Sequence, residues 1–175
     1  FWEEKGYVTA REFRRFCGPT IPLARMSRRV FTQAETFEGD IEVAHFGAEP
    51  IEQAETRWRL VDRRGATLRA GELARQTIPL GNSISLGRVT VDLNALPAPA
   101  CYRLVIELRG AGGTGDRGTQ PHPENDWDIW VYPTTIDTAP PPGVTITSTL
   151  DATAVATLEG GGKVLWLLSP DRVRP

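Results

Sequence analysis

The chain has 175 residues, of which 40% are hydrophobic and 24% charged, and its formal net charge is -2 at pH 7. This composition is typical of one globular domain of ordinary size with short appendages, and it excludes a large catalytic barrel. Its 20 basic and 22 acidic side chains are mixed along the sequence, so no basic stripe predicts nucleic-acid binding, and no apolar run is long enough to cross a bilayer.

Residues 1–27 predict a short helix followed by an extended segment. Thr9 and, three residues later, Glu12 make a capping box, which predicts a helix over about residues 10–17. Gly18 and the prolines after it end this helix and favour an extended chain. Because so short a helix cannot bury its apolar side chains alone, we expect this segment to be the exit from a preceding domain.

Residues 28–133 show apolar residues with a period of two and turn residues between the runs, which is typical of an antiparallel all-β domain. The expected strands are 29–33, 40–46, 56–62, part of 67–80, 83–93, 101–109 and 125–133. In the fifth of these, a bulge at Gly87 would bring the apolar residues on its two sides to one face. In the sixth, the residues expected to point inward are Tyr102, Leu104, Ile106 and Leu108.

The predicted fold class is mainly β, an immunoglobulin-like antiparallel β-sandwich over residues 28–133. Trp58 on the third strand and Tyr102 at the start of the sixth match the core tryptophan and the tyrosine corner of that fold. Cys17 and Cys101 are the only cysteines. We expect two small buried thiols, and a disulfide between them is left open.

The composition changes after residue 133. Residues 134–143 are rich in proline and predict a stiff linker. Residues 144–175 predict a strand, a helix capped by Asp151, a stop at three glycines, and a continuous apolar strand of the kind that is buried on both faces. We therefore expect an incomplete α/β unit that is the start of a further domain.

One glycine motif and the two histidines suggest a cofactor or catalytic site but lack the surroundings that such a site needs. Residues 110–115 satisfy the G-x-G-x-x-G pattern, but the prolines that follow exclude the helix of a dinucleotide site. His45 is expected to be a hydrogen-bonded structural residue, and His122, between two prolines, to be solvated in a loop. We therefore predict no cofactor, no metal site and no catalytic residue in this chain.

The stretch NDWDIWVYP, residues 125–133, concentrates aromatic and acidic side chains. Alternation places Trp127, Ile129 and Val131 on a core face, and Asp126, Asp128, Trp130 and Tyr132 on the opposite face. The two aspartates would lie about 6 to 7 Å apart, which alone does not exclude glycosidic cleavage. Exposed acids on a flat strand nevertheless favour a salt-bridged surface, so we expect this face to contact another domain or a carbohydrate.

Four stretches, residues 6–26, 30–47, 58–65 and 125–133, together resemble the region after the catalytic barrel in glycoside hydrolase family 2 proteins of the β-galactosidase-like type. The resemblance covers about residues 1–133. The matching residues are not catalytic in that family, whose paired glutamates lie in the barrel. The resemblance implies an immunoglobulin-like module of a glycosidase that is periplasmic or secreted.

The predicted function is therefore a non-catalytic β-sandwich module that supports domain packing in a multidomain glycoside hydrolase of carbohydrate metabolism. The fragment itself is not predicted to be an enzyme. The alternative is a carbohydrate-binding module in which Trp130 and Tyr132 form a stacking platform while Asp126 and Asp128 bond hydroxyls. The expected partners are other domains of the parent chain and, in the alternative, an oligosaccharide, with no nucleic acid and no membrane.

Overall fold

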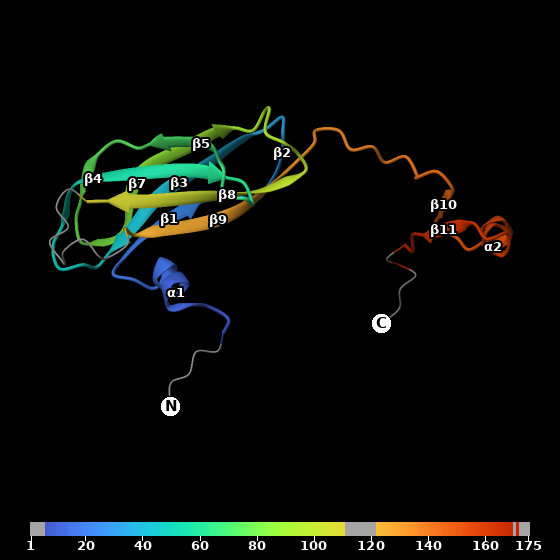
Figure 1. The fold of residues 1–175 in the computed structure, drawn as a ribbon, viewed down its shortest axis with the longest axis horizontal. Helices are drawn as coiled ribbons and strands as arrows, with labels where there is room; N and C mark the ends of the chain where they lie inside the picture. The colour runs from blue at the N-terminus through green and yellow to red at the C-terminus, as the bar shows by residue number, and fades with distance from the viewer. Residues whose placement is uncertain (1–5, 111–121, 170, 172–175) are drawn as a thin grey trace. The chain divides into compact units, whose positions relative to one another are not determined.

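The computed structural model describes residues 6–110, 122–169 and 171. Within this part the chain is mainly β-structure, and it divides into two compact units, Phe1–Thr134 and Thr135–Pro175. The first unit contains a short helix and a β-sandwich, and the second contains a small α/β arrangement (Figure 1). Residues 111–115 of the G-x-G-x-x-G pattern lie outside the described residues.

Two sheets face each other in the first unit (Figure 1). The smaller sheet has the order β1-β3-β7, formed by Thr20–Arg25, Thr36–His45 and Gly81–Asp92. The larger sheet has the order β2-β9-β8-β4-β5, formed by Val30–Thr32, Glu124–Tyr132, Ala100–Arg109, Ile51–Val61 and Thr67–Glu72. β6, Gln76–Ile78, also pairs with β4. β2 runs parallel to β9, whereas the other neighbouring strands of the sandwich are antiparallel.

The N-terminal helix is as the sequence predicts, but the segment after it is a strand. Helix α1, Ala10–Phe16, begins at the capping box, in which the Glu12 N–H donates to the Thr9 hydroxyl at 3.2 Å and the Thr9 N–H donates to the Glu12 carboxylate at 2.8 Å. The extended segment contains β1, which pairs with β3 and belongs to the sandwich that we expected to begin at residue 28. Pro22 hides this strand in the sequence, because an outermost strand tolerates the missing N–H while proline is rare inside sheets.

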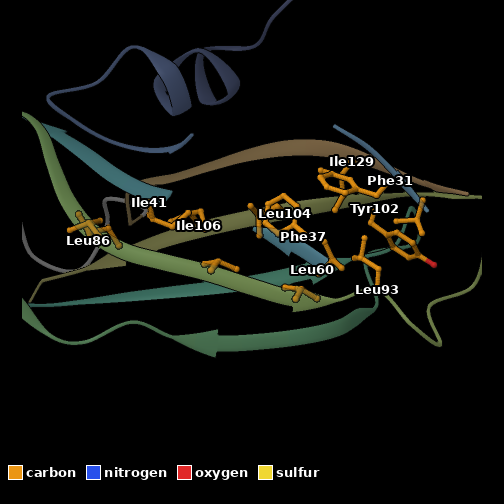
Figure 2. Close-up of a cluster of buried hydrophobic side chains, with 14 of the residues drawn as sticks. Phe31, Phe37, Ile41, Leu60, Leu86, Leu93, Tyr102, Leu104, Ile106 and Ile129 are labelled. Carbon is orange, nitrogen blue, oxygen red and sulfur yellow. The ribbon is translucent and has the colours of Figure 1, made fainter. Parts of the chain in front are cut away.

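The core lies between the two sheets and is built by alternation along the strands (Figure 2). The predicted inward face of β8 is confirmed, since Tyr102, Leu104, Ile106 and Leu108 are each at most 2% exposed. From the other sheet, Phe37 packs edge to face on Phe31 of β2, with ring centroids 5.7 Å apart. This double-layer packing confirms the mainly β sandwich class.

The bulge expected at Gly87 is present in β7. Ile41 pairs with Gly87 and the next residue, Glu42, pairs with Ser85, so that Leu86 is the additional residue. Gly87 has a φ of 121°, which side chains other than glycine rarely adopt. The bulge leaves Leu86 buried on the same core face as Val89, as the sequence predicts.

Tyr102 has the hydrogen bond of a tyrosine corner. Its hydroxyl donates to the backbone carbonyl of Pro97, five residues upstream. Trp58 has a different environment from the predicted core tryptophan, because it is only partly buried at the margin of the core. Its indole extends toward β5, where a Cβ added to Gly71 would lie 2.8 Å from the indole nitrogen.

The second unit has the predicted order of strand, helix and strand. β10, Val144–Thr147, runs parallel to β11, Lys163–Trp166, and helix α2, Ala152–Glu159, connects them. The Asp151 carboxylate caps the helix by accepting the Ala154 N–H at 2.9 Å. The prediction that the apolar run after the glycines is buried on both faces is wrong for this two-stranded sheet, since Leu165 and Trp166 are 47% and 45% exposed. Two strands and one helix are too few to cover both faces.

The cysteines are free, with Cys17 exposed and Cys101 partly exposed. The expectation of two buried thiols is wrong for Cys17, because it is the C-cap of α1 and not part of the core. Among the described residues, no helix has the length and apolar character needed to cross a bilayer.

Candidate functional site

The outward face of β9 carries the four residues that the sequence singled out. Ile129 and Val131 are fully buried on the opposite face, and Trp127 packs against the same core. Asp126, Asp128 and Trp130 are partly buried, and Tyr132 is 40% exposed. The strand therefore divides as alternation predicts, but its outward face is not uniform, because the acids and the aromatic residues have different neighbours.

The carboxylates of this face are held by arginines from three elements. Arg15 of α1 reaches Glu124 at 2.5 Å and also pairs with Asp126. Arg103 of β8 lies 3.0 Å from Asp126 and 3.0 Å from Asp128, so both predicted acids share one guanidinium. These carboxylates raise the pKa of Arg103, and the hydrogen bond that Arg103 donates to Asp128 is the largest cause.

The same pattern continues across the sheet onto β4 and β5. Arg59 lies 2.7 Å from Glu124, and Arg57 lies 3.1 Å from both Glu55 and Glu72. At Glu55, desolvation is outweighed by Arg57 and then Arg75, which together hold the pKa of this carboxyl below its usual range. We call this surface the charged lattice; its members are Arg15, Glu55, Arg57, Arg59, Glu72, Arg75, Arg103, Glu124, Asp126 and Asp128.

The charged lattice decides what the two aspartates can do chemically. A glycosidase acid works from an environment that favours its protonated form, and its partner needs a cleft that holds the sugar. Asp126 and Asp128 instead form ion pairs with guanidinium groups on the outward face of the sheet. Their geometry supports a salt-bridged surface.

Trp130 and Tyr132 line a groove of about 600 Å³ at the end of the larger sheet. One wall is the turn after β4, and the other is the loop before β8. We call this site the aromatic groove; its lining is Asp62, Arg63, Arg64, Leu68, Pro97, Pro99, Ala100, Cys101, Tyr102, Trp130 and Tyr132. Its volume falls in the range of roughly 300–1,000 Å³ that small-ligand sites occupy.

The cations of the aromatic groove differ from those of the charged lattice. Arg63 and Arg64 are exposed, and neither forms an ion pair with a described residue. Asp62 lies in the chain between β4 and these arginines. Its carboxylate is hydrogen-bonded to the backbone, since it accepts the N–H of Arg64 at 2.8 Å and the N–H of Ala66 at 2.9 Å. The two guanidinium groups outnumber this one carboxylate, so the net charge at this end of the groove is positive.

The histidines are placed as expected. His45 is 3% exposed; its Nε2 donates to the Glu49 carbonyl at 2.9 Å, and its Nδ1 is hydrogen-bonded to the Thr20 hydroxyl at 2.8 Å. This arrangement ties β1 to the end of β3 and is structural. His122 is exposed. The described residues contain no group of three or more His, Cys, Asp or Glu side chains arranged to hold a metal ion.

The sequence pointed to Trp130 and Tyr132 but not to the rest of the aromatic groove. The turn after β4 was predicted, yet its arginines were not connected with β9, because β8 lies between these two strands in the sheet. The pairing of Cys101 with Trp130 and of Leu60 with Leu104 brings the three segments to one end. No local pattern in the sequence carries that information.

A family model described as "Domain of unknown function (DUF8488)" matches residues 35–133. No curated protein matches the chain. Among solved structures, the sporulation control protein Spo0M from Bacillus subtilis has 15% identity and a TM-score of 0.47, over 66% of this chain and 50% of that chain. The CARDB domain of PF1109 from Pyrococcus furiosus has 10% identity and a TM-score of 0.44, over 65% of this chain and 91% of that chain. A β-glucuronidase from Parabacteroides merdae has 12% identity and a TM-score of 0.38, over 65% of this chain and 13% of that chain. Likenesses this weak carry no functional argument.

Proposed function

Since the chain belongs to the family described as a domain of unknown function (DUF8488), we propose its function from its own residues: a non-catalytic β-sandwich module that packs against other domains of a multidomain glycoside hydrolase. The β-sandwich itself is observed in the two facing sheets. The glycosidase parent and its periplasmic or secreted location rest on the resemblance of residues 1–133 to glycoside hydrolase family 2 proteins.

The observation that carries the non-catalytic function is the charged lattice. Of the two acids on β9 that suggest glycosidic chemistry, Asp126 is bound to Arg15 and Arg103, and Asp128 is bound to Arg103. Side chains in such a network are held in place by charge-assisted hydrogen bonds, which suits a surface with a structural role. A hydrolase would need one of these carboxyl groups protonated and open to substrate.

Helix α1 supports the packing function. Arg15 anchors it to β9, while Phe13 and Phe16 are each 51% exposed and lie edge to face with centroids 5.3 Å apart. A helix that is held in place with two phenylalanines facing outward offers an apolar contact of the kind found at interdomain surfaces. In the proposed function, Phe13 and Phe16 contact a neighbouring domain of the parent chain.

Two experiments test the proposal. The 175-residue chain should release no nitrophenol from aryl glycosides above the blank, and Asp126→Asn should not alter that rate. Saturable hydrolysis that Asp126→Asn abolishes would contradict the non-catalytic function.

Packing is tested by binding of the chain to the remaining domains of the parent protein added in trans. The double variant Phe13→Ser/Phe16→Ser should weaken this binding at least tenfold. The matched control is Phe46→Ser, because Phe46 is 65% exposed and lies outside α1. Equal affinities for the three proteins, with unchanged circular dichroism, would exclude the helix as the contact.

A second candidate function is carbohydrate binding, and the aromatic groove is the observation that favours it. Trp130 is partly exposed and Tyr132 is 40% exposed within a concave site. Aromatic faces provide flat apolar contact for sugar rings, and the groove has the volume of a small-ligand site. The sequence predicts that Asp126 and Asp128 bond the sugar hydroxyls. Because both aspartates are paired with Arg103, the residues of the aromatic groove are better candidates for contacting the sugar.

A further inference from the structure

The aromatic groove joins two features that neither packing nor catalysis uses, an aromatic strand end and a pair of free arginines. We infer that it binds a short acidic oligosaccharide, with a sugar ring against Trp130 and a carboxylate or sulfate group bound by Arg63 and Arg64. This inference rests on the second candidate function and specifies its ligand. It is independent of the packing function.

The cationic wall is held in shape before any ligand arrives. In the turn after β4, the Asp62 N–H donates to the Ala66 carbonyl at 2.9 Å and the Gly65 N–H donates to the Asp62 carbonyl at 3.0 Å. Gly65 has a φ of 84°, which lets the turn close tightly. With the two side-chain hydrogen bonds of Asp62, these contacts fix the backbone that carries both arginines, so that binding orders only their side chains.

The opposite wall is also anchored. The Tyr102 hydroxyl donates to the Pro97 carbonyl and ties the loop before β8 to the buried ring. From the other side of the loop, the Leu96 carbonyl accepts the side-chain amide of Gln33 at 2.6 Å. Trp130 and Tyr132 thus project from a strand toward a loop that is pinned at both of these points.

Charge selects the anionic class of ligand. Arg57, Arg59 and Arg103 on the same sheet face are each occupied by carboxylates. Arg63 and Arg64 have no carboxylate partner in the described part of the chain, and the nearby Asp62 is occupied by backbone N–H groups. Guanidinium groups bind carboxylate and sulfate oxygens with paired hydrogen bonds, and these bonds are stronger than those to neutral hydroxyls.

Size and surrounding charge select a short saccharide over a nucleic acid. A volume of about 600 Å³ accommodates two or three sugar rings and not a long chain. A single-stranded nucleic acid would need a basic track along its backbone. On the neighbouring surface, Arg103 is already paired with Asp126 and Asp128 and does not extend a basic track, and the whole chain has a net charge of -2.

The test is isothermal titration of the full 175-residue chain at low salt with four probes: trigalacturonate, a sulfated chondroitin tetrasaccharide, neutral galactotriose and oligo(dT). The acidic sugars should bind with dissociation constants of roughly 0.1–1 mM, and galactotriose should bind at least tenfold more weakly. Tighter binding of trigalacturonate would identify carboxylate as the preferred group, and tighter binding of the chondroitin probe would identify sulfate.

Two variants assign the binding to this groove. Arg63→Gln/Arg64→Gln should reduce the affinity for the better acidic probe at least tenfold and leave the weak binding of galactotriose unchanged. Trp130→Ala should weaken both. The charge-matched control is Arg14→Gln/Arg69→Gln, because both arginines are exposed and lie outside the groove. Urea midpoints of all variants check that the fold is kept.

Four outcomes would overturn the inference. The first three are equal affinity for neutral and acidic trisaccharides, equal loss in the groove variant and its control, and tighter binding of oligo(dT) than of either acidic sugar. The fourth is the absence of any saccharide binding. That result would leave the packing function intact, since packing is measured by binding of the chain to the other domains of the parent protein.

Discussion

Replacing Tyr102 with phenylalanine removes one hydroxyl from the core and keeps the ring. Tyr102 is 2% exposed, and its hydroxyl donates to the Pro97 carbonyl. Phenylalanine cannot donate, so the Pro97 carbonyl loses this partner. A hydrogen bond lost in this way costs about 1–3 kcal/mol, and we expect the free energy of unfolding to fall by that amount.

Urea unfolding of the full chain, followed by near-ultraviolet circular dichroism, measures the loss. The midpoint should fall while the dependence on urea concentration stays the same, because the surface exposed on unfolding does not change. Tyr132→Phe is the control, since Tyr132 is 40% exposed and its hydroxyl donates to no described residue. Its free energy of unfolding should change by less than about 0.5 kcal/mol.

The same substitution should alter how stability depends on pH. Burial, with the charge of Asp62, raises the pKa of Tyr102. The unfolded chain therefore releases this proton at lower pH than the folded chain, so the stabilisation is complete below the ordinary tyrosine pKa of about 10 and declines above it. Tyr102→Phe should show a shallower decline above pH of about 10. Parallel profiles, or a loss below about 0.5 kcal/mol at pH 7, would refute this account of the hydroxyl.

Three further substitutions test other parts of the fold. Leu104→Ala should lower the free energy of unfolding by about 2–5 kcal/mol in urea, because Leu104 is fully buried between the sheets; a smaller loss would mean that the core collapses around the gap. Gly71→Ala should cost about 1–3 kcal/mol and shift the tryptophan fluorescence, because the new Cβ would lie 2.8 Å from the Trp58 indole; an unchanged spectrum would count against that contact. Asp151→Ala should speed amide exchange in the first turn of α2 and destabilise the helix by about 0.5–2 kcal/mol; unchanged exchange there would refute the cap.

The strands of the sandwich could be predicted because their burial follows from alternation. The inward face of β8 is a local pattern, and so is the glycine that marks the bulge in β7. β1 was harder to predict, since Pro22 is unfavourable within a sheet and only the outermost position makes it acceptable. Whether a strand is outermost depends on the complete sheet order, which no single segment specifies.

Burial of the second unit was predicted wrongly for a related reason. The apolar run of β11 is typical of a strand covered on both faces, but covering requires neighbours. In the described part of the chain, β11 pairs with β10, and Leu165 is 47% exposed. A sequence pattern states how apolar a strand is, whereas its exposure depends on which elements pack against it.

The functional surface could be predicted in part. Alternation assigned Trp130 and Tyr132 to the outward face of β9, and the residue types favoured either packing or carbohydrate binding. The partners of the acids could not be predicted, because Arg15 and Arg103 come from segments far away in sequence. The same is true of Arg63, which reaches the aromatic groove through strand pairing across β8.

The parallel pairing of β2 with β9 has a consequence for how the chain reaches its native state. Val30 lies beside Trp130, so this contact forms only after almost all of the sandwich has left the ribosome. Contacts between residues so distant in sequence slow folding, because a long loop must close before they stabilise the structure. During synthesis, Phe31 therefore lacks its strand neighbour Val131 until β9 is made, and an unpaired strand edge of this kind favours aggregation until it is covered.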